Sequence, residues 1–337
     1  MISIQCILSI LSLIIQSTTL AQANRHTDIT NPQFVQFSVN EGLSHSTVLS
    51  CCQDSLGHMW FATNDGLNRY DGYEFHVYRS NDDDTTSISS NIIRKVYCSR
   101  NGQIWIGTEN GLSRYDIEAD CFHNFPTSGK TVTGIVEIEH GSRLMVASGG
   151  GLYFFDMQSL AWDRSAPHCQ KESFGATILY REDENIWIGT QQDGLFCYNL
   201  NSDEFKKVAD YPGKRPILCI TKHNGDIWVA TEGDGLMRIN KMTGATKNYQ
   251  HTKGSHDSIS SNYVRTLSSD VQGRLWVGTF NGLDIIENGN ILNIKSDPFT
   301  PGSLSQPSVR CITRDNQGGM WLGTASVSRY LAPVSGL

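Results

Sequence analysis

The sequence lacks a basic stripe or tail, because its 27 Lys and Arg residues are outnumbered by 34 Asp and Glu residues, giving a formal net charge of −7. Bulk attraction to nucleic acid or to an anionic membrane surface is therefore not expected. The chain also lacks a Cys-x-x-Cys pair or a Cys/His cluster with zinc-like spacing, so we predict no metal site and no cofactor. After residue 15, no apolar run is long enough to cross a bilayer.

The sequence is instead dominated by a short motif that recurs seven times. Each copy is an apolar run centred on Trp, followed by Gly-Thr or Ala-Thr, a turn and Gly-Leu. The motif centres are 40 to 48 residues apart and lie at Trp60, Trp105, Met145, Trp187, Trp228, Trp276 and Trp321, the third copy being degenerate. A period of this length predicts a repeat architecture in which each unit packs on its neighbours.

The turn residues divide each repeat into strands. Asn-Gly or Asp-Gly follows most copies of the motif, as in Asn110-Gly111, and supplies the positive φ angles of a tight hairpin. The returning segment, such as 67–71, alternates apolar and polar residues as a half-buried strand does. Four short antiparallel strands per repeat are typical of a β-propeller blade. We therefore predict an all-β, seven-bladed β-propeller.

The repeated Trp residues are interpreted as scaffold. Blades pack face to face, so central strands are covered on both sides and become nearly continuously apolar. The Gly or Ala two residues after each Trp is expected to leave room for a bulky side chain of the neighbouring blade.

Ring closure can be predicted from the two ends of the repeat array. The seventh unit supplies an inner strand near 309–313, the Trp321 strand and a third strand ending at Tyr330, but no fourth strand follows. The segment 34–39 resembles the outer strands of other units, so we expect it to complete the last blade and remove the exposed edges. One propeller over 32–332, a tail at 333–337 and no second domain are predicted.

The first residues resemble a secretion signal. An apolar core at 4–15 precedes Ala21-Gln22-Ala23, an Ala-x-Ala cleavage site, although no Lys or Arg precedes the core. We predict a signal peptide over 1–23, a linker over 24–31, a periplasmic location and no membrane span in the mature chain. An uncleaved anchor is the alternative.

Nine Cys residues would permit disulfides in an oxidising compartment. Cys51 and Cys219 each stand nine residues before a Trp, so we expect equivalent buried positions on inner strands, and Cys51 and Cys52 should point to opposite faces. Structural free thiols are expected, with one or two incidental disulfides as the alternative.

The repeat residues carry a family resemblance. The segment 54–72 resembles the two-component regulator propeller repeat, and 37–44 is similar to the start of the periplasmic sensor region of hybrid two-component systems. The resemblance implies two propellers followed by an immunoglobulin-like domain, a membrane helix, a histidine kinase, a receiver and a DNA-binding module, and many members recognise glycan fragments. This chain resembles only the N-terminal sensor portion of such proteins, so we expect a truncated gene, a fragment or a stand-alone relative. Kinase activity is therefore not expected of this chain.

Candidate ligand-binding residues lie at the entries to the inner strands. Units 1, 2, 6 and 7 share a Ser-rich entry pattern and would be consecutive in a closed ring. The residue eleven positions before the Trp is an arginine in units 2, 6 and 7, namely Arg94, Arg265 and Arg310. In unit 1 the residue at this position is Leu49. Three guanidinium groups at one height around a channel mouth would bind carboxylate or sulfate. The proposed ligand-binding set is Arg94, Arg265, Arg310, Asn91, Asn262 and Tyr263. In the alternative reading, the Asn residues terminate turns and the Arg residues solvate a water-filled channel.

The predicted function is an extracytoplasmic sensor, not an enzyme, that binds an oligosaccharide or other small ligand. Further partners would be the remaining receptor domains or a second copy in a homodimer. One alternative is a propeller lyase or hydrolase acting on a polysaccharide or cyclic peptide, because streptogramin lyases contain similar Trp-Gly-Thr units. Another is a protein-protein interaction scaffold.

Overall fold

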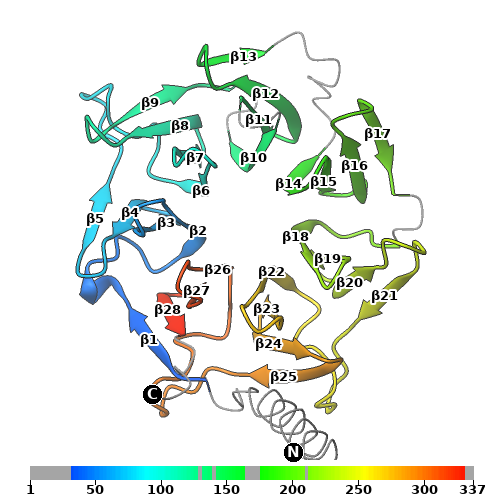
Figure 1. Ribbon diagram of the computed structural model, residues 1–337. Coiled ribbons are helices and arrows are strands. Elements are labelled where there is room, and N and C mark those ends of the chain that lie inside the picture. The colour runs from blue at the N-terminus through cyan, green and yellow to red at the C-terminus, as the bar shows by residue number, and fades with distance from the viewer. Residues whose placement is uncertain (1–31, 128–130, 139–141, 164–174, 209–211, 331–337) are drawn as a thin grey trace, which may run out of the picture. The chain divides into compact units, whose positions relative to one another are not determined.

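A computed structural model of the chain describes residues 32–127, 131–138, 142–163, 175–208 and 212–330. These residues form seven four-stranded antiparallel sheets arranged in a ring (Figure 1), which confirms the predicted seven-bladed β-propeller. In this part of the chain, no helix has the length and apolar character needed to cross a membrane. The predicted signal peptide, linker and tail lie outside the described residues.

The blades follow one another along the chain, each running from an inner to an outer strand. Blades 1 to 3 consist of β2 Val48–Gln53, β3 Met59–Thr63, β4 Gly66–Tyr70 and β5 Phe75–Tyr78; β6 Ile93–Cys98, β7 Ile104–Thr108, β8 Gly111–Asp116 and β9 Cys121–Phe125; and β10 Val132–Ile138, β11 Arg143–Ser148, β12 Gly151–Asp156 and β13 Ala161–Asp163. Blades 4 and 5 consist of β14 Ala176–Glu182, β15 Asn185–Thr190, β16 Leu195–Asn199 and β17 Glu204–Lys207; and β18 Ile217–His223, β19 Asp226–Thr231, β20 Leu236–Ile239 and β21 Thr246–Tyr249. Blade 6 consists of β22 Val264–Ser269, β23 Leu275–Thr279, β24 Gly282–Glu287 and β25 Asn290–Ile294.

Blade 7 joins the two ends of the repeat array. It contains β26 Cys311–Arg314, β27 Met320–Gly323 and β28 Val327–Tyr330, and its outer strand is β1 Phe34–Phe37. Phe34 lies opposite Tyr330 and Phe37 opposite Val327, so the predicted closure by the N-terminal segment is confirmed.

The closing strand is two residues shorter than the predicted segment 34–39. Ser38 begins a 3-10 turn, η1 Val39–Glu41, and its hydroxyl accepts the Asn40 N–H at 3.1 Å. The Glu41 carboxylate accepts the Ser38 N–H at 2.6 Å, so this reciprocal cap ends the strand.

The core lies between adjacent blades, and the small residue after each Trp is what lets them approach. A Cβ added at Gly189 would lie 2.5 Å from Cγ2 of Ile217, and one at Gly278 would lie 2.8 Å from Cγ1 of Val309. Ile217 is the first residue of the next inner strand, Val309 lies two residues before β26, and both are fully buried. The predicted space-making role of these glycines is therefore confirmed.

An Asp residue holds the repeated Trp in three blades, a contact that the sequence analysis missed. In blades 1, 6 and 7 the indole N–H donates at 2.8 Å to the carboxylate of the Asp six residues earlier, namely Asp54, Asp270 and Asp315. Blade 2 has Ser99 at this position, and the indole nitrogen of Trp105 has no hydrogen-bond partner.

The cysteines require one correction. Cys51 lies opposite Phe61, whereas Cys219 lies opposite Ala230, so these two residues are offset by one position and are not equivalent. The turns explain the error, because five residues separate the paired strands in blade 1 and two in blade 5. Cys51 and Cys52 do face opposite sides, toward blade 7 and blade 2 respectively. The seven cysteines that the structure describes are free thiols.

Candidate ligand-binding site

One face of the ring carries a set of seven equivalent, partly exposed residues. In six blades the inner strand contains a β-bulge directly after its first, buried residue. A bulge leaves one residue unpaired and turns its side chain away from the regular pleat. The bulged residues and the matching residue of blade 7 are Leu49, Arg94, Thr133, Thr177, Leu218, Arg265 and Arg310. Counting eleven residues back from each Trp identified only four of these seven residues. The others were missed because the turn between the inner strand and the Trp strand differs in length among the blades.

In blades 2 and 6, a second residue from the same blade accompanies the bulged position. It follows the Thr of the Trp motif, and in blades 2 and 6 it is Glu109 and Phe280. The Glu109 N–H donates to the Ile92 carbonyl at 3.2 Å, and the Phe280 N–H donates to the Tyr263 carbonyl at 3.0 Å. This shared backbone contact places the side chain of the turn residue beside the bulged one. The turn residue therefore contributes directly to the environment of Arg94 and of Arg265.

Arg94 is neutralised by its turn residue. Its Nη2 forms an ion pair and hydrogen bond with Oε1 of Glu109, and both side chains are about one-third exposed. The predicted ligand-binding role of Arg94 therefore requires displacement of an existing acidic partner.

Arg265 and Arg310 lack such a partner among the residues that the structure describes. Arg265 lies over the Phe280 ring, with Cζ 5.6 Å from the ring centroid, and its Nε is buried with no hydrogen-bond partner. Burial lowers the pKa of the Arg265 guanidinium, the positive charge of Arg310 lowers it further, and Glu232 opposes the shift. Two guanidinium groups therefore lie close enough to repel one another.

Two half-exposed aromatic rings lie beside Arg265. Tyr263 is 51% exposed and Phe280 is 54% exposed, with ring centroids 6.3 Å apart and an interplanar angle of 56°. Exposed aromatic faces beside unpaired cations provide both a stacking surface and donors for an anionic group.

Asn91 and Asn262 connect blades. The Asn91 side-chain oxygen accepts the Ser80 N–H at 2.7 Å, and the Asn262 side-chain oxygen accepts the His251 N–H at 2.7 Å. Their backbone carbonyls accept N–H groups from the preceding blade's hairpin, at Gly66 for Asn91 and at Gly233 and Gly235 for Asn262. These contacts support the alternative reading in which both Asn residues terminate turns.

The same face is hollowed beside the arginine pair. A hollow of about 430 Å³ is lined by Lys214, Arg215, Glu232 and Tyr263, together with Gln191. Gln191 also lines a neighbouring hollow of about 620 Å³, which contains the bulged residues Thr133, Thr177 and Leu218. Sequence analysis missed Lys214, Arg215 and Glu232, because the entry to blade 5 departs from the shared pattern.

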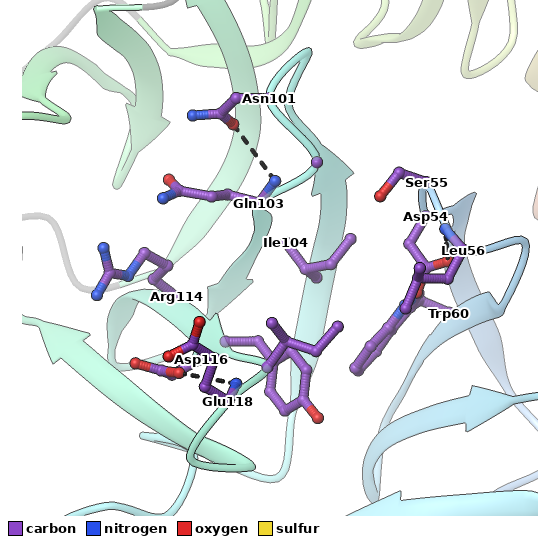
Figure 2. Close-up of a pocket in the computed structure, with 13 residues that line it drawn as sticks. Asp54, Ser55, Leu56, Trp60, Asn101, Gln103, Ile104, Arg114, Asp116 and Glu118 are labelled. Carbon is purple, nitrogen blue, oxygen red and sulfur yellow. Dashed lines mark hydrogen bonds between the residues drawn. The ribbon is translucent and has the colours of Figure 1, made fainter.

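Other hollows lie at the opposite face of the blades, where inner strands turn back. Figure 2 shows a pocket of about 360 Å³ between blades 1 and 2, with Trp60 on one side and Arg114 near Asp116 and Glu118 on the other. Arg114 Nε is buried without a hydrogen-bond partner, and Ser99 occupies the position of the Asp found in blades 1, 6 and 7. Trp60 is only 1% exposed, so it offers no stacking surface. Within the described ranges, no group of three or more His, Cys, Asp or Glu could hold a metal ion.

Comparison with known proteins identifies repeats of a known family in this chain. The two-component regulator propeller family matches residues 42–65, 87–110, 258–281 and 303–326, which open blades 1, 2, 6 and 7. These four blades are consecutive in the ring, as predicted. A segment of 56 residues, 17% of this chain, is 48% identical to histidine kinase P4 of Formosa agariphila and covers 4% of that protein.

Several solved structures have the same fold over most of the chain. The extracellular domain described as belonging to the hybrid two-component system BT3049 of B. thetaiotaomicron matches 89% of this chain with 27% identity and a TM-score of 0.75. The corresponding domain of BT4673 matches 89% with 24% identity and a TM-score of 0.71. A streptogramin B lyase shares the fold alone, with 13% identity over 88% of the chain and a TM-score of 0.68.

The chain spans 42% of the BT3049 domain and 40% of the BT4673 domain. Its repeats, blade number and strand order agree with the family match. The chain is therefore a seven-bladed propeller that contains four two-component regulator propeller repeats.

Proposed function

We propose that this propeller is an extracytoplasmic sensor domain that binds an acidic oligosaccharide at the hollowed face near Arg265 and Arg310. The observation that carries the proposal is that Arg265 and Arg310, at matching positions of the neighbouring blades 6 and 7, form no ion pair among the described residues, and that Arg265 lies beside two half-exposed aromatic rings. A sugar ring could stack on Tyr263 or Phe280 while its carboxylate or sulfate accepts hydrogen bonds from the arginines.

The similarity to extracellular domains of hybrid two-component systems supports a sensor role. An extracytoplasmic location agrees with these relatives and with the predicted signal peptide at 1–23. Because the closed ring buries both faces of each blade, we expect binding to change the association with other receptor domains or a second copy, not the shape of the ring.

The test is calorimetric titration of the purified protein with acidic and neutral polysaccharide digests. Substituting Arg265→Ala and Arg310→Ala together should weaken binding of the acidic ligand by at least about 30-fold, since truncated charge contacts cost about 2 kcal/mol or more. Arg94→Ala is the matched control and should change affinity little, because Glu109 already neutralises Arg94. Unchanged affinity in the double variant would refute the site.

The same titration distinguishes the alternative functions. Release of shortened or unsaturated products would favour a lyase or hydrolase, whose fold-level precedent is the streptogramin B lyase. Binding only to other receptor domains, with no response to any digest, would favour an interaction scaffold.

A further inference from the structure

Two buried thiols meet where the first and last blades touch. Cys51 lies on β2 of blade 1 and Cys311 on β26 of blade 7, and their sulfur atoms are 3.6 Å apart. Their exposed fractions are 8% and 7%, and both belong to the apolar cluster between these blades. The two residues are 260 positions apart in the sequence, so their contact exists only because the ring is closed.

The surrounding contacts hold the thiols in this position. Thr313 Oγ1 donates to the Cys51 carbonyl at 2.9 Å, which fixes the two inner strands side by side. Cys311 packs over Gly323, where an added Cβ would lie only 2.5 Å from its sulfur. A thiol pair held by both backbones can form a disulfide if small side-chain rotations bring the sulfur atoms to bonding distance.

The two thiols differ in acidity. Hydrogen bonding to the Cys311 thiol lowers the pKa of Cys51, burial opposes this shift, and Lys95 adds a favourable charge. The same contact, together with burial, raises the pKa of Cys311. Cys51 is therefore the thiol that ionises first and becomes the nucleophile.

We propose that Cys51 and Cys311 form an oxidation site at which a disulfide joins the first blade to the last. The oxidant is a small disulfide such as oxidised glutathione, which reaches the buried Cys51 when the contact between β2 and β26 opens locally. The Cys51 thiolate attacks one of its sulfur atoms, forms a mixed disulfide and releases one glutathione thiolate. Cys311 then loses its proton and attacks the Cys51 sulfur, which releases the second glutathione thiolate. The two protein thiols lose two electrons, and the oxidant gains them.

The test is peptide mapping of the full chain after incubation with oxidised glutathione under native conditions. Trypsin releases Cys311 in residues 311–314 and Cys51 in residues 26–69, a peptide that also contains Cys52. We expect these two peptides to be joined in the wild type and in Cys52→Ser, but not in Cys51→Ser or Cys311→Ser. Recovery of both cysteines as alkylated free thiols, or a bond from Cys311 to Cys52, would overturn the proposal.

Thermal unfolding provides a second measurement that does not depend on the peptides. The oxidised wild type should melt roughly 4 to 8 °C above the reduced wild type, because the new bond constrains the unfolded chain. Reduction should change the melting temperature of Cys51→Ser and Cys311→Ser much less. An equal response in the wild type and both variants would also overturn the proposal.

Discussion

At the scale of single residues, the propeller depends on buried carboxylates that organise the turn before each Trp strand. Asp270 accepts the backbone N–H groups of Gln272 and Arg274, and its other oxygen accepts the indole N–H of Trp276. The same oxygen lies 2.6 Å from Arg274 Nε, and both charged side chains are only 2% exposed. A single carboxylate therefore satisfies several groups that would otherwise be buried without partners.

Replacing Asp270 with Ala should lower the free energy of unfolding by about 3 to 5 kcal/mol, because the Arg274 charge would remain buried and unpaired. The measurement is denaturant unfolding at neutral pH. In the control variant, Asp270→Ala combined with Arg274→Met, part of the loss should be recovered. A similar loss in both variants would show that the hydrogen bonds to the turn, and not the ion pair, dominate.

A second buried carboxylate makes stability depend on pH. Burial raises the pKa of Asp284, and hydrogen bonds from Ser260 and Asn293 only partly oppose this shift. The folded state therefore binds more protons than the unfolded state between pH of about 4 and the raised pKa, so this group's contribution to stability falls as the pH rises through that window. Blade 1 has Asn68 at the equivalent position, where its side-chain oxygen accepts the Ser44 N–H at 2.8 Å.

Asp284→Asn should therefore fold, and the difference in unfolding free energy between wild type and variant should shift in favour of the wild type as the pH falls from 7 toward 4. Denaturant titrations at several pH values measure this difference. A constant difference across the range would contradict the assigned pKa shift.

At the scale of elements, the short strand β1 closes the ring mainly through its aromatic side chains. The ring of Phe37 stacks on Trp321, with centroids 5.8 Å apart and an interplanar angle of 22°. Phe37 also contacts Tyr70 of blade 1, so it joins the first blade to the last. Val35 on the same strand is 54% exposed and contributes little to this contact.

We expect Phe37→Ala to lower the free energy of unfolding by about 3 kcal/mol, since it removes a large aromatic contact between two blades. Val35→Ala is the control and should change stability by less than about 1 kcal/mol. Denaturant unfolding of both variants checks the prediction. Equal effects would mean that backbone pairing, not aromatic packing, holds β1 in place.

A further prediction at this scale concerns the close packing of neighbouring blades at Gly189. Gly189→Ala would place a methyl group 2.5 Å from Ile217 and 2.7 Å from Ile178. The resulting overpacking should cost about 1 to 3 kcal/mol in unfolding free energy. Ala230 occupies the same motif position in blade 5. A negligible effect of Gly189→Ala would therefore contradict the prediction and show that blade 4 can move apart from blade 5 enough to accommodate an alanine.

At the scale of the whole molecule, closure leaves no blade with a free apolar face, so the described blades should unfold together. Trp105 in blade 2 and Trp276 in blade 6 are both fully buried. For Trp105→Phe and for Trp276→Phe, fluorescence and circular dichroism should each report one transition with a common midpoint. Two separated midpoints in either variant would indicate that some blades unfold independently.

The blade number and the closing strand could be predicted because they depend on local patterns that recur along the chain. The environment of each arginine could not, because it depends on which turn residue folds back beside it. Arg94 and Arg265 have the same sequence spacing, yet one meets Glu109 and the other Phe280. The predicted equivalence of Cys51 and Cys219 was wrong for a related reason, since hairpin length alters the register between strands.

The bulge at the start of the inner strands places the residue needed for packing between blades and the residue exposed at the face of the ring at two different sequence positions. In the six blades with a bulge, and at the matching position of blade 7, the residue before this position is buried between blades, whereas the residue at the position is partly exposed. Selection can therefore change charge, size and polarity at seven sites around one opening while the packing that maintains the ring stays constant. Receptors for chemically different ligands can thus evolve from one scaffold by substitution at these sites, with little loss of stability at each step.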